Sequence, residues 1–225
     1  MQVSRSPLVT ATIPIFQRAF LLWVLSMPAA MSCHPQTVII SVYDYSDVSA
    51  RETVRATQAA GLAMGAGIPI VWRYCRGELA VQSEVSCAGE LEFNEIVVRL
   101  QPRGPRDTVN ERKLVLGQAI VTAEGGSYVT ISVSAVRAQA AEFGMDFALL
   151  LGYAVAHEVG HCVLGPDHSY AGLMRGIWDR KDALDMSRRR FHLTEQEART
   201  AARRLTPAEL TAKRLPEQPS ASRSR

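Results

Sequence analysis

Short runs of β-branched and aromatic residues, several of them alternating with polar residues, recur over the first 133 positions after an apolar N-terminal segment. Runs of this kind, bounded by glycine, proline or polar clusters, predict β-strands. The stretch 128–133 alternates most regularly, and Pro69 favours the start or the edge of a sheet for its own strand. We therefore expect strands at 37–43, 68–72, 93–100, 114–121 and 128–133.

Helical patterns occupy the segments between and after these strands. Ser49 with Glu52 three residues later forms a capping box, so we expect a helix from there to about Met64. An alanine-rich helical stretch begins at Ala135, and from Asp146 the chain is apolar nearly all round, which marks a buried helix. That helix is too short and too rich in His and Glu at its end for a membrane span, and we expect it to end near 165–166. Two short helices are expected to begin at 194 and 207.

Composition and charge bound the class of protein. The 225 residues are 47% hydrophobic and 21% charged, which fits one globular domain and excludes a disordered chain. With the strands and helices expected above, we expect the α+β class. The net charge of +3 alone indicates no acidic partner. The C-terminal stretch is rich in arginine but has no aromatic residues interleaved with the charges, so we expect a solvated helix face and tail and no nucleic-acid binding. We expect a domain at 33–206, a basic, disordered tail at 207–225 and a monomer.

The first 32 residues have the order of an export signal. Arg5 and Arg18 are basic, an apolar run covers 19–25, and Ala30 and Ser32 suit the small-residue positions before a cut at Cys33. The alternatives are a retained N-terminal membrane anchor, or lipid attachment at Cys33, whose preceding residues match a lipoprotein box poorly. We therefore expect an exported protein, periplasmic or secreted, that contacts a membrane only through this segment if it stays uncleaved or is lipidated.

Cys75 and Cys87 flank a short polar segment. In an exported protein a disulfide that closes this loop is plausible, because oxidising compartments preserve such bonds. Two unpaired thiols are the alternative, and the spacing argues against a metal-binding pair.

The segment His157-Glu158-Val159-Gly160-His161 is an H-E-x-x-H motif near the end of the expected buried helix. Histidines four residues apart project from one helix face and can share a metal ion. Zinc suits imidazole ligands and keeps an open position in catalytic sites. Glu158 can then act as the general base for a zinc-activated water and return the proton to a leaving amine. A pair of hydrogen-bonded core histidines is the alternative interpretation.

Residues 157–169 resemble the metzincin signature H-E-x-x-H-x-x-G-x-x-H in its matrixin form ending in His-Ser, and 172–174 resemble the methionine turn of that clan. They are similar also to uncharacterised exported bacterial proteins with an H-E-[IV]-G-H motif. The resemblance is strongest from about 128 to 178. It implies a zincin-like fold: a twisted mixed sheet, a buried active-site helix and a loop-rich C-terminal part. It also implies that an edge strand, expected at 128–133, pairs with an extended peptide.

The third metal ligand implied by the resemblance is His168. Leu164 is extra relative to the signature, so Gly165 and His168 each come one residue late. Asp167 is the nearest substitute, and a later glutamate, Glu195 or Glu197, is the other alternative.

Three further residues are expected around the metal. The resemblance gives Met174 the role of a hydrophobic floor beneath the metal. Ser169 is a candidate for fixing the orientation of a ligand. Tyr170 is a candidate for stabilising an oxyanion.

Together these features predict a zinc metallopeptidase, expected to be an endopeptidase acting on peptide or protein substrates, with His157, His161 and His168 on the metal and Glu158 as base. The alternative is an exported non-catalytic zinc-binding or interaction domain. Glu158 favours the enzyme, because a structural site has no need of a carboxylate there. A zinc hydrolase acting on a non-peptide amide or ester is disfavoured only by the family resemblance.

Overall fold

The computed structural model describes residues 37–46, 48–65, 67–82, 87–104, 114–121 and 127–206. The chain separates into Met1–Cys33 and His34–Arg225, and every described residue belongs to the second unit. The expected signal at 1–32, the helix expected at 207 and the basic tail lie outside the described residues.

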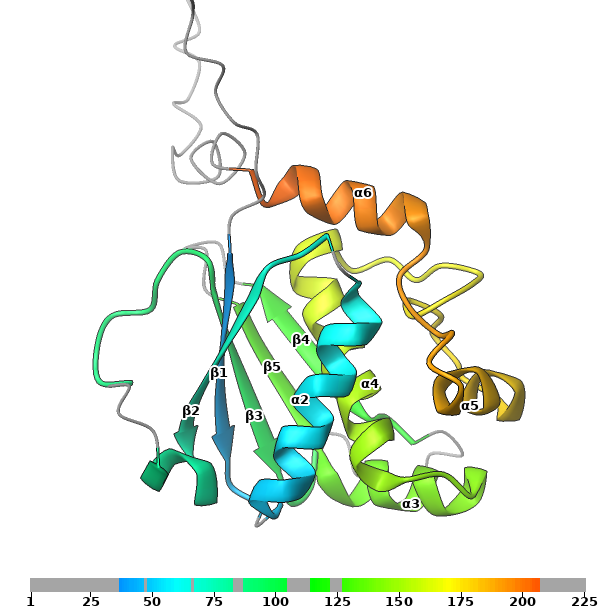
Figure 1. Ribbon diagram of the computed structural model, residues 1–225, viewed down its shortest axis with the longest axis horizontal. Coiled ribbons are helices and arrows are strands. Elements are labelled where there is room, and N and C mark those ends of the chain that lie inside the picture. Colours follow the sequence, from blue (N-terminus) through cyan, green and yellow to red (C-terminus); the bar gives the residue numbers. More distant parts are fainter. Residues whose placement is uncertain are drawn as a thin grey trace, which may run out of the picture. The chain divides into compact units, whose positions relative to one another are not determined.

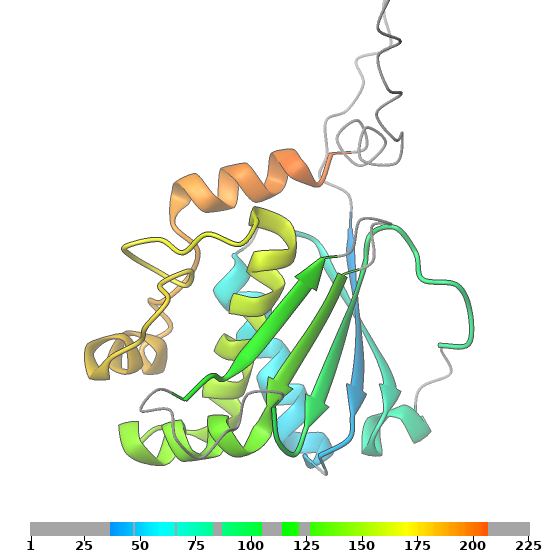
Figure 2. The same cartoon turned by 180° about the vertical axis from the view of Figure 1, so that it is seen from behind.

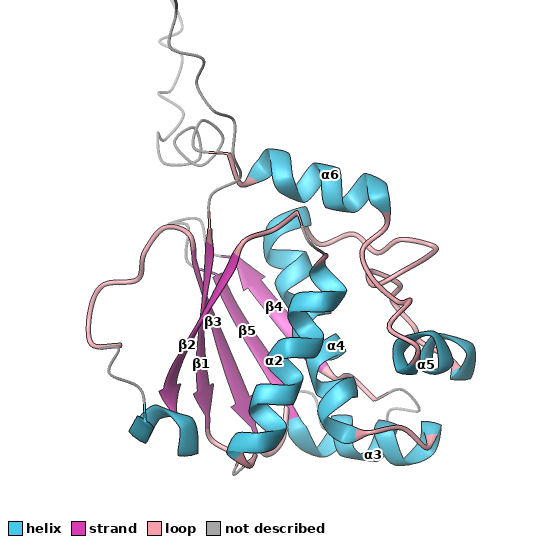
Figure 3. Ribbon diagram, in the orientation of Figure 1, coloured by secondary structure: helices cyan, strands magenta, loops and turns pink. Residues whose placement is uncertain are grey.

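Strands and helices alternate at first and helices dominate the end of the described chain (Figure 1). Figure 3 shows the same elements coloured by type. In chain order they are β1 (Val38–Asp44), α2 (Ala50–Met64), β2 (Ile70–Arg76), the 3-10 turn η1 (Glu78–Gln82), β3 (Glu95–Gln101), β4 (Gly117–Val121), β5 (Ser127–Ser132), α3 (Val133–Phe143), α4 (Phe147–Leu164), α5 (Arg180–Ser187) and α6 (Glu195–Arg204).

The five strands form one mixed sheet in the order β2-β1-β3-β5-β4. The first four run parallel, and β4 pairs antiparallel with β5 at one edge. The α+β class is therefore correct. The expectation that 128–133 is the edge strand is wrong, because β5 is bonded on both sides and the strand just before it in the chain forms the edge. The last expected strand residue, Val133, instead begins α3, since the Ser132 side chain accepts the Ala135 N–H and caps that helix.

Helices α2 and α4 cover one face of the sheet (Figures 1 and 2). Alternate strand residues point toward these helices, and Ile40, Val98 and Ile131 are fully buried there. The expected capping box of α2 is present, with Ser49 and Glu52 bonded reciprocally. The strand alternation and the helix cap thus place a continuous apolar core between the sheet and the two helices.

The buried helix α4 lies directly against α2. The expectation that it is too short for a membrane span is wrong, because its 18 residues are long and apolar enough to cross a membrane. However, 67% of its most apolar window is buried inside the fold, which is the pattern of a core helix. The two helices approach closely at Gly152, where an added Cβ would come 2.7 Å from Ala59 Cβ and would also overlap the Ala56 carbonyl oxygen. The absence of a side chain at this position therefore sets the distance between the two helices.

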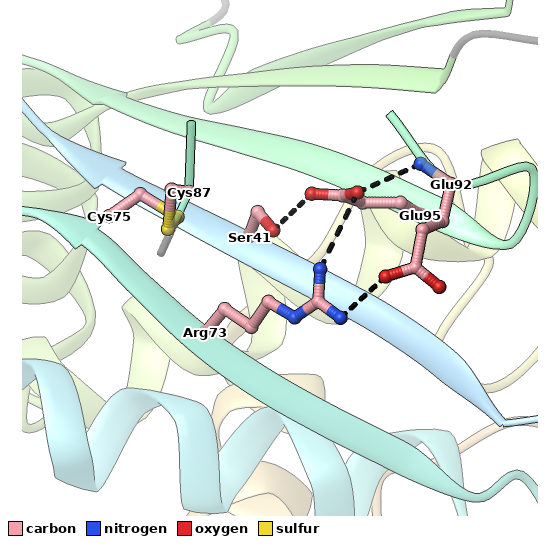
Figure 4. The surroundings of a disulfide bond; sticks show 6 residues. All are labelled: Ser41, Arg73, Cys75, Cys87, Glu92 and Glu95. Atoms are coloured by element: carbon pink, nitrogen blue, oxygen red, sulfur yellow. Dashed lines mark hydrogen bonds and ion pairs between the residues drawn. A yellow bond between two sulfur atoms is a disulfide. The ribbon is translucent and has the colours of Figure 1, made fainter. Parts of the chain in front are cut away.

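The opposite face of the sheet carries a polar network beside a disulfide (Figure 4). Cys75 at the end of β2 is bonded to Cys87, twelve residues later. The buried Glu95 carboxylate accepts hydrogen bonds from the Ser41 hydroxyl and from a backbone N–H, and Arg73 lies 3.8 Å from it. These contacts tie the segment after the disulfide to β1 and β2, and they satisfy a carboxylate whose burial alone would be costly.

The part of the chain after α4 consists mainly of a long loop and two short helices, as expected for a loop-rich C-terminal region. Asp179 caps α5, which the sequence pattern did not predict, and the buried Asp182 carboxylate accepts from both the Asp179 N–H and the Arg175 guanidinium. Helix α6 begins where expected, and Thr194 caps it in a capping box with Glu197. The Arg175–Asp182 pair therefore fastens the loop onto α5.

Candidate metal centre

Helix α4 presents the H-E-x-x-H motif in its last two turns. Its N-cap is Asp146, whose side chain accepts the Leu149 N–H. Gly165 caps the C-terminal end of the helix. Its φ of 104° favours glycine, and its N–H donates to the His161 carbonyl. Leu164, the residue that is extra to the metzincin signature, is the last residue of the helix. The chain then turns back towards the histidines.

Three imidazoles meet at the turn: those of His157, His161 and His168, whose candidate ligand atoms all lie within 4.8 Å of one another. The two on the helix are closest, with 3.1 Å between their Nε2 atoms. For two nitrogens bound to one tetrahedral zinc at about 2.0–2.1 Å, the separation would be roughly 3.3 Å. These three histidines could therefore bind a metal ion.

Backbone carbonyls fix the orientation of both helix imidazoles. The Leu173 carbonyl lies 2.8 Å from His157 Nδ1, and the Gly165 carbonyl lies 2.9 Å from His161 Nδ1. Carbonyl oxygens only accept, so each Nδ1 must carry the proton and each Nε2 lone pair faces the other. Two lone pairs at this distance repel unless a cation or a proton lies between them, so the donor set fits a metal ion.

His168 arrives from the loop after α4, next to Gly176. An added Cβ at Gly176 would meet the His168 ring at 3.0 Å, so a side chain there would force the ring to shift by a few tenths of an ångström. The ring centroid lies 4.8 Å from that of His161 and 5.4 Å from that of His157. The structure therefore brings His168, and not Asp167, Glu195 or Glu197, into the described cluster of potential ligands.

Met174 lies under the histidine-bearing turn of α4. Its side chain is buried, and its sulfur fills the space that a Cβ on Gly160 would need. The neighbouring Leu173 supplies the carbonyl that orients His157. The methionine therefore packs against the helix between the two histidines.

The other two residues expected around the metal lie differently. The Ser169 hydroxyl donates to the Ala171 carbonyl within its own loop, and the Ser169 N–H donates to the Met174 carbonyl. Tyr170 is fully exposed, and it is not among the residues that line the cleft beside the histidines. In the described chain Ser169 therefore stabilises its own loop, and Tyr170 lies outside the cleft.

Burial changes the titration of the groups on α4. It lowers the pKa of His157 to about 4 and raises that of Glu158 to about 7. A hydrogen bond from the Ala119 backbone on β4 partly opposes the shift of Glu158. The pKa of Cys162 rises to about 12, again mainly through burial, so its thiol stays protonated at neutral pH. His157 is thus neutral and able to bind a metal over a wide pH range.

A cleft of about 1020 Å³ opens beside the three histidines and Glu158. One wall is the edge strand β4, where Gly117 makes room for Glu158: an added Cβ would meet Glu158 Cγ at 2.7 Å. The other wall is the loop that contains Ile177 and Trp178, and the ring of Trp178 lies edge-on to His157. A second cavity, of about 470 Å³, contacts α2 and α4 and contains none of these groups.

Some residues of the site carry no recognisable signal in the sequence. Gly117, Trp178 and Arg204 all line the cleft but lie outside the motif. Gly117 precedes α4 by thirty residues and is placed by strand pairing, and Arg204 is placed by the packing of α6. Such long-range contacts leave no spacing pattern that identifies them.

No protein-family model matches the chain, and no curated protein matches it significantly.

Proposed function

We propose that this protein is a zinc-dependent metallopeptidase with a zincin-like fold. The observation that carries the proposal is the convergence of three imidazoles, two of them fixed by backbone carbonyls, in a cleft that also contains a buried carboxylate. His157, His161 and His168 would hold the metal.

The carboxylate of Glu158 has the surroundings of a general base. Zinc, when bound, supplies Lewis-acid chemistry that polarises a carbonyl and lowers the pKa of water. Glu158 takes the proton of the attacking water and passes it to the nitrogen of the broken peptide bond. Its burial makes it a stronger base than an exposed glutamate, and the Ala119 N–H holds it in place against β4.

The edge strand β4 supports a peptide substrate over other amides and esters. Among the described strands β4 has a neighbour on one side only, and its residues 117–119 line the cleft. An extended peptide can add to such an edge through main-chain hydrogen bonds, which places a peptide bond near the histidines. Cleavage inside a chain is favoured over removal of end residues, because β4 borders the cleft and the cleft is open.

The alternative of a non-catalytic zinc-binding domain fits the cleft less well. A structural zinc site is usually closed by four protein ligands, whereas three imidazoles form the described cluster. The volume beside the cluster is open, and Glu158 lines it without joining the cluster. Both features suit a site that admits a substrate.

Export to an oxidising compartment is part of the proposal. The Cys75–Cys87 disulfide would be reduced in most cytosols and would persist outside them. This agrees with the charged, apolar and small-residue order of the first 32 residues.

The function is tested by peptide cleavage. The purified protein is loaded with zinc and incubated with an unbiased peptide library, beside Glu158→Gln and His157→Ala. We expect cleavage by the wild type alone, zinc retained in Glu158→Gln and zinc lost in His157→Ala. Zinc binding by the wild type with no cleavage of any peptide would refute the enzyme assignment. Equal cleavage by Glu158→Gln would refute the role of Glu158 as general base.

A further inference from the structure

The cleft contains one guanidinium that has no carboxylate partner in the described chain. Arg175 and Arg204 both line the cleft. Arg175 is neutralised, because it binds Asp182 and lies 3.6 Å from Asp179. Arg204, the last residue of α6, makes no ion pair with any described residue. The positive charge available to a ligand is therefore that of Arg204.

Backbone carbonyls hold the Arg204 side chain in place. Its Nη1 donates to the carbonyl of Val163, at 3.2 Å, and to that of Leu164. Those carbonyls are in the last turn of α4, where the helix leaves acceptors unsatisfied. A guanidinium has five N–H donors in a planar fork, so Nη2 and Nε keep donors for a ligand. Because the helix end fixes the group, a ligand need not order it.

This fixed cation lies close to the metal centre. A Cβ added to Gly165 would lie 3.7 Å from Arg204 Nη1, and the Gly165 carbonyl orients His161. Figures 1 and 2 show α6 passing over the C-terminal end of α4, next to the end of β4. A peptide along β4 would therefore bring a residue near the cut bond to Arg204.

The opposite end of the cleft has a different charge. Glu142, near the end of α3, lines the cleft beside Gln139, which donates to its carboxylate. Glu142 lies five residues before α4, and Arg204 contacts the last residues of α4. The 18 residues of α4 span about 27 Å, so the two charges are at separate ends of the cleft.

We propose that Arg204 is a specificity-determining residue that selects peptides with an acidic side chain at the α6 end of the cleft. The proposal rests on the peptidase function, because it assumes that a peptide occupies the cleft along β4. A carboxylate can accept two parallel N–H bonds from a guanidinium, which a neutral amide or a lysine cannot reproduce.

The test measures peptide binding without cleavage. The full chain carrying Glu158→Gln is loaded with zinc, and its affinity for labelled peptides is measured by fluorescence anisotropy. The peptides share one neutral sequence in which each position in turn is Glu, Gln or Lys. We expect one position at which Glu binds about fivefold more tightly than Gln, and Lys more weakly than both. Raising the salt concentration should reduce this preference.

Variants at two neighbouring arginines separate charge recognition from a structural role. Arg204→Gln should bring the Glu-to-Gln affinity ratio to about one, while zinc content and melting temperature stay close to those of the parent. Arg204→Lys should keep part of the preference. Arg203→Gln removes the same charge from the next residue, which is exposed and does not line the cleft, and should leave the ratio unchanged.

Three outcomes overturn the proposal: no position prefers Glu, Arg204→Gln weakens binding of all peptides equally, or Arg203→Gln has the same effect as Arg204→Gln. Failure of the peptidase function is distinguishable from these. A Glu preference that depends on Arg204, without cleavage by the wild type, would support the role of Arg204 and refute the enzyme assignment. Cleavage without a Glu preference would support the enzyme assignment and refute the role of Arg204. No peptide binding at all would refute both.

Discussion

Replacing Gly152 by alanine tests how closely α2 and α4 are packed. The new Cβ would lie 2.7 Å from Ala59 Cβ and 3.1 Å from the Ala60 nitrogen, and it would overlap the Ala56 carbonyl oxygen. Apolar carbons normally stay 3.5–4.0 Å apart, so the overlap is about 1 Å. Most of the obstructing atoms are backbone, and α2 would have to move as a unit.

The expected cost follows from two opposing effects. Overpacking of a well-packed core costs about 1–3 kcal/mol, and we take the upper end because backbone atoms obstruct. Alanine recovers about 1 kcal/mol over glycine in a helix. The net loss should be about 2 kcal/mol, which for a domain of this size lowers the melting temperature by about 4–8 °C.

Urea unfolding of the purified protein measures this difference, with Gly61→Ala as the matched control. Gly61 is in α2, and a Cβ there would meet no atom within 4 Å, so alanine should stabilise the protein by about 0.5–1 kcal/mol. If Gly152→Ala were as stable as the wild type or Gly61→Ala, the described contact between the two helices would be wrong.

Three further predictions concern the disulfide, the floor of the site and the pH dependence of stability. Replacing both Cys75 and Cys87 by alanine should lower the free energy of unfolding by about 2–3 kcal/mol, because the disulfide closes a loop of twelve residues. Reductant should destabilise the wild type by the same amount. Equal stability with and without the disulfide would contradict this prediction. Gly160→Ala should weaken zinc affinity about tenfold in a chelator competition assay, because the buried Met174 sulfur beneath the histidines must move. Unchanged affinity would show that this packing does not position the histidines. In the metal-free protein, burial lowers the pKa of His157 to about 4 from its ordinary value of 6.5. The contribution of neutral His157 to stability is therefore present above pH 6.5 and is lost as the pH falls towards 4. The loss in the free energy of unfolding is about 3 kcal/mol at most. The pKa of Glu158, raised to about 7, has the opposite effect between pH 7 and 4.5. Urea unfolding of metal-free Glu158→Gln should therefore show a steeper loss on acidification than that of the wild type. Parallel pH profiles would contradict the Glu158 shift, and a variant profile that stays flat from pH 6.5 to 4 would contradict the His157 shift.

Local signals predicted much of the fold. The capping box at Ser49 and Glu52 and the strand at β1 depend on neighbouring residues, and they are found where the sequence places them. The buried helix α4 follows from an apolar run that needs no partner to be recognised. The two helix histidines follow from a spacing of four residues, which the helix itself converts into proximity.

The order of strands in the sheet could not be read from local pattern. The segments at β4 and β5 both have strand character, and nothing within either shows which one has two neighbours. The edge is decided by the pairing of β5 with β3, across about thirty residues of chain, and β4 then adds antiparallel on the outside. The site depends on this order, because the edge strand forms one wall of the cleft.

The position of the third histidine also required the structure. Leu164 shifts the sequence signature by one residue, and spacing alone cannot show whether a loop absorbs that shift. In the structure Leu164 extends α4 by one residue, and Gly165 then turns the chain so that His168 returns to the other two rings. Gly176 leaves the space that the returning ring needs.

In the proposed site three imidazoles hold one metal ion and leave one coordination position open. X-ray absorption at the zinc edge of the zinc-loaded protein tests this arrangement most directly, together with the zinc content per chain. We expect one zinc per chain, three imidazole ligands and one further light atom at about 2.0 Å, with no sulfur. A sulfur ligand at about 2.3 Å, four protein ligands, or no zinc bound after reconstitution would contradict it.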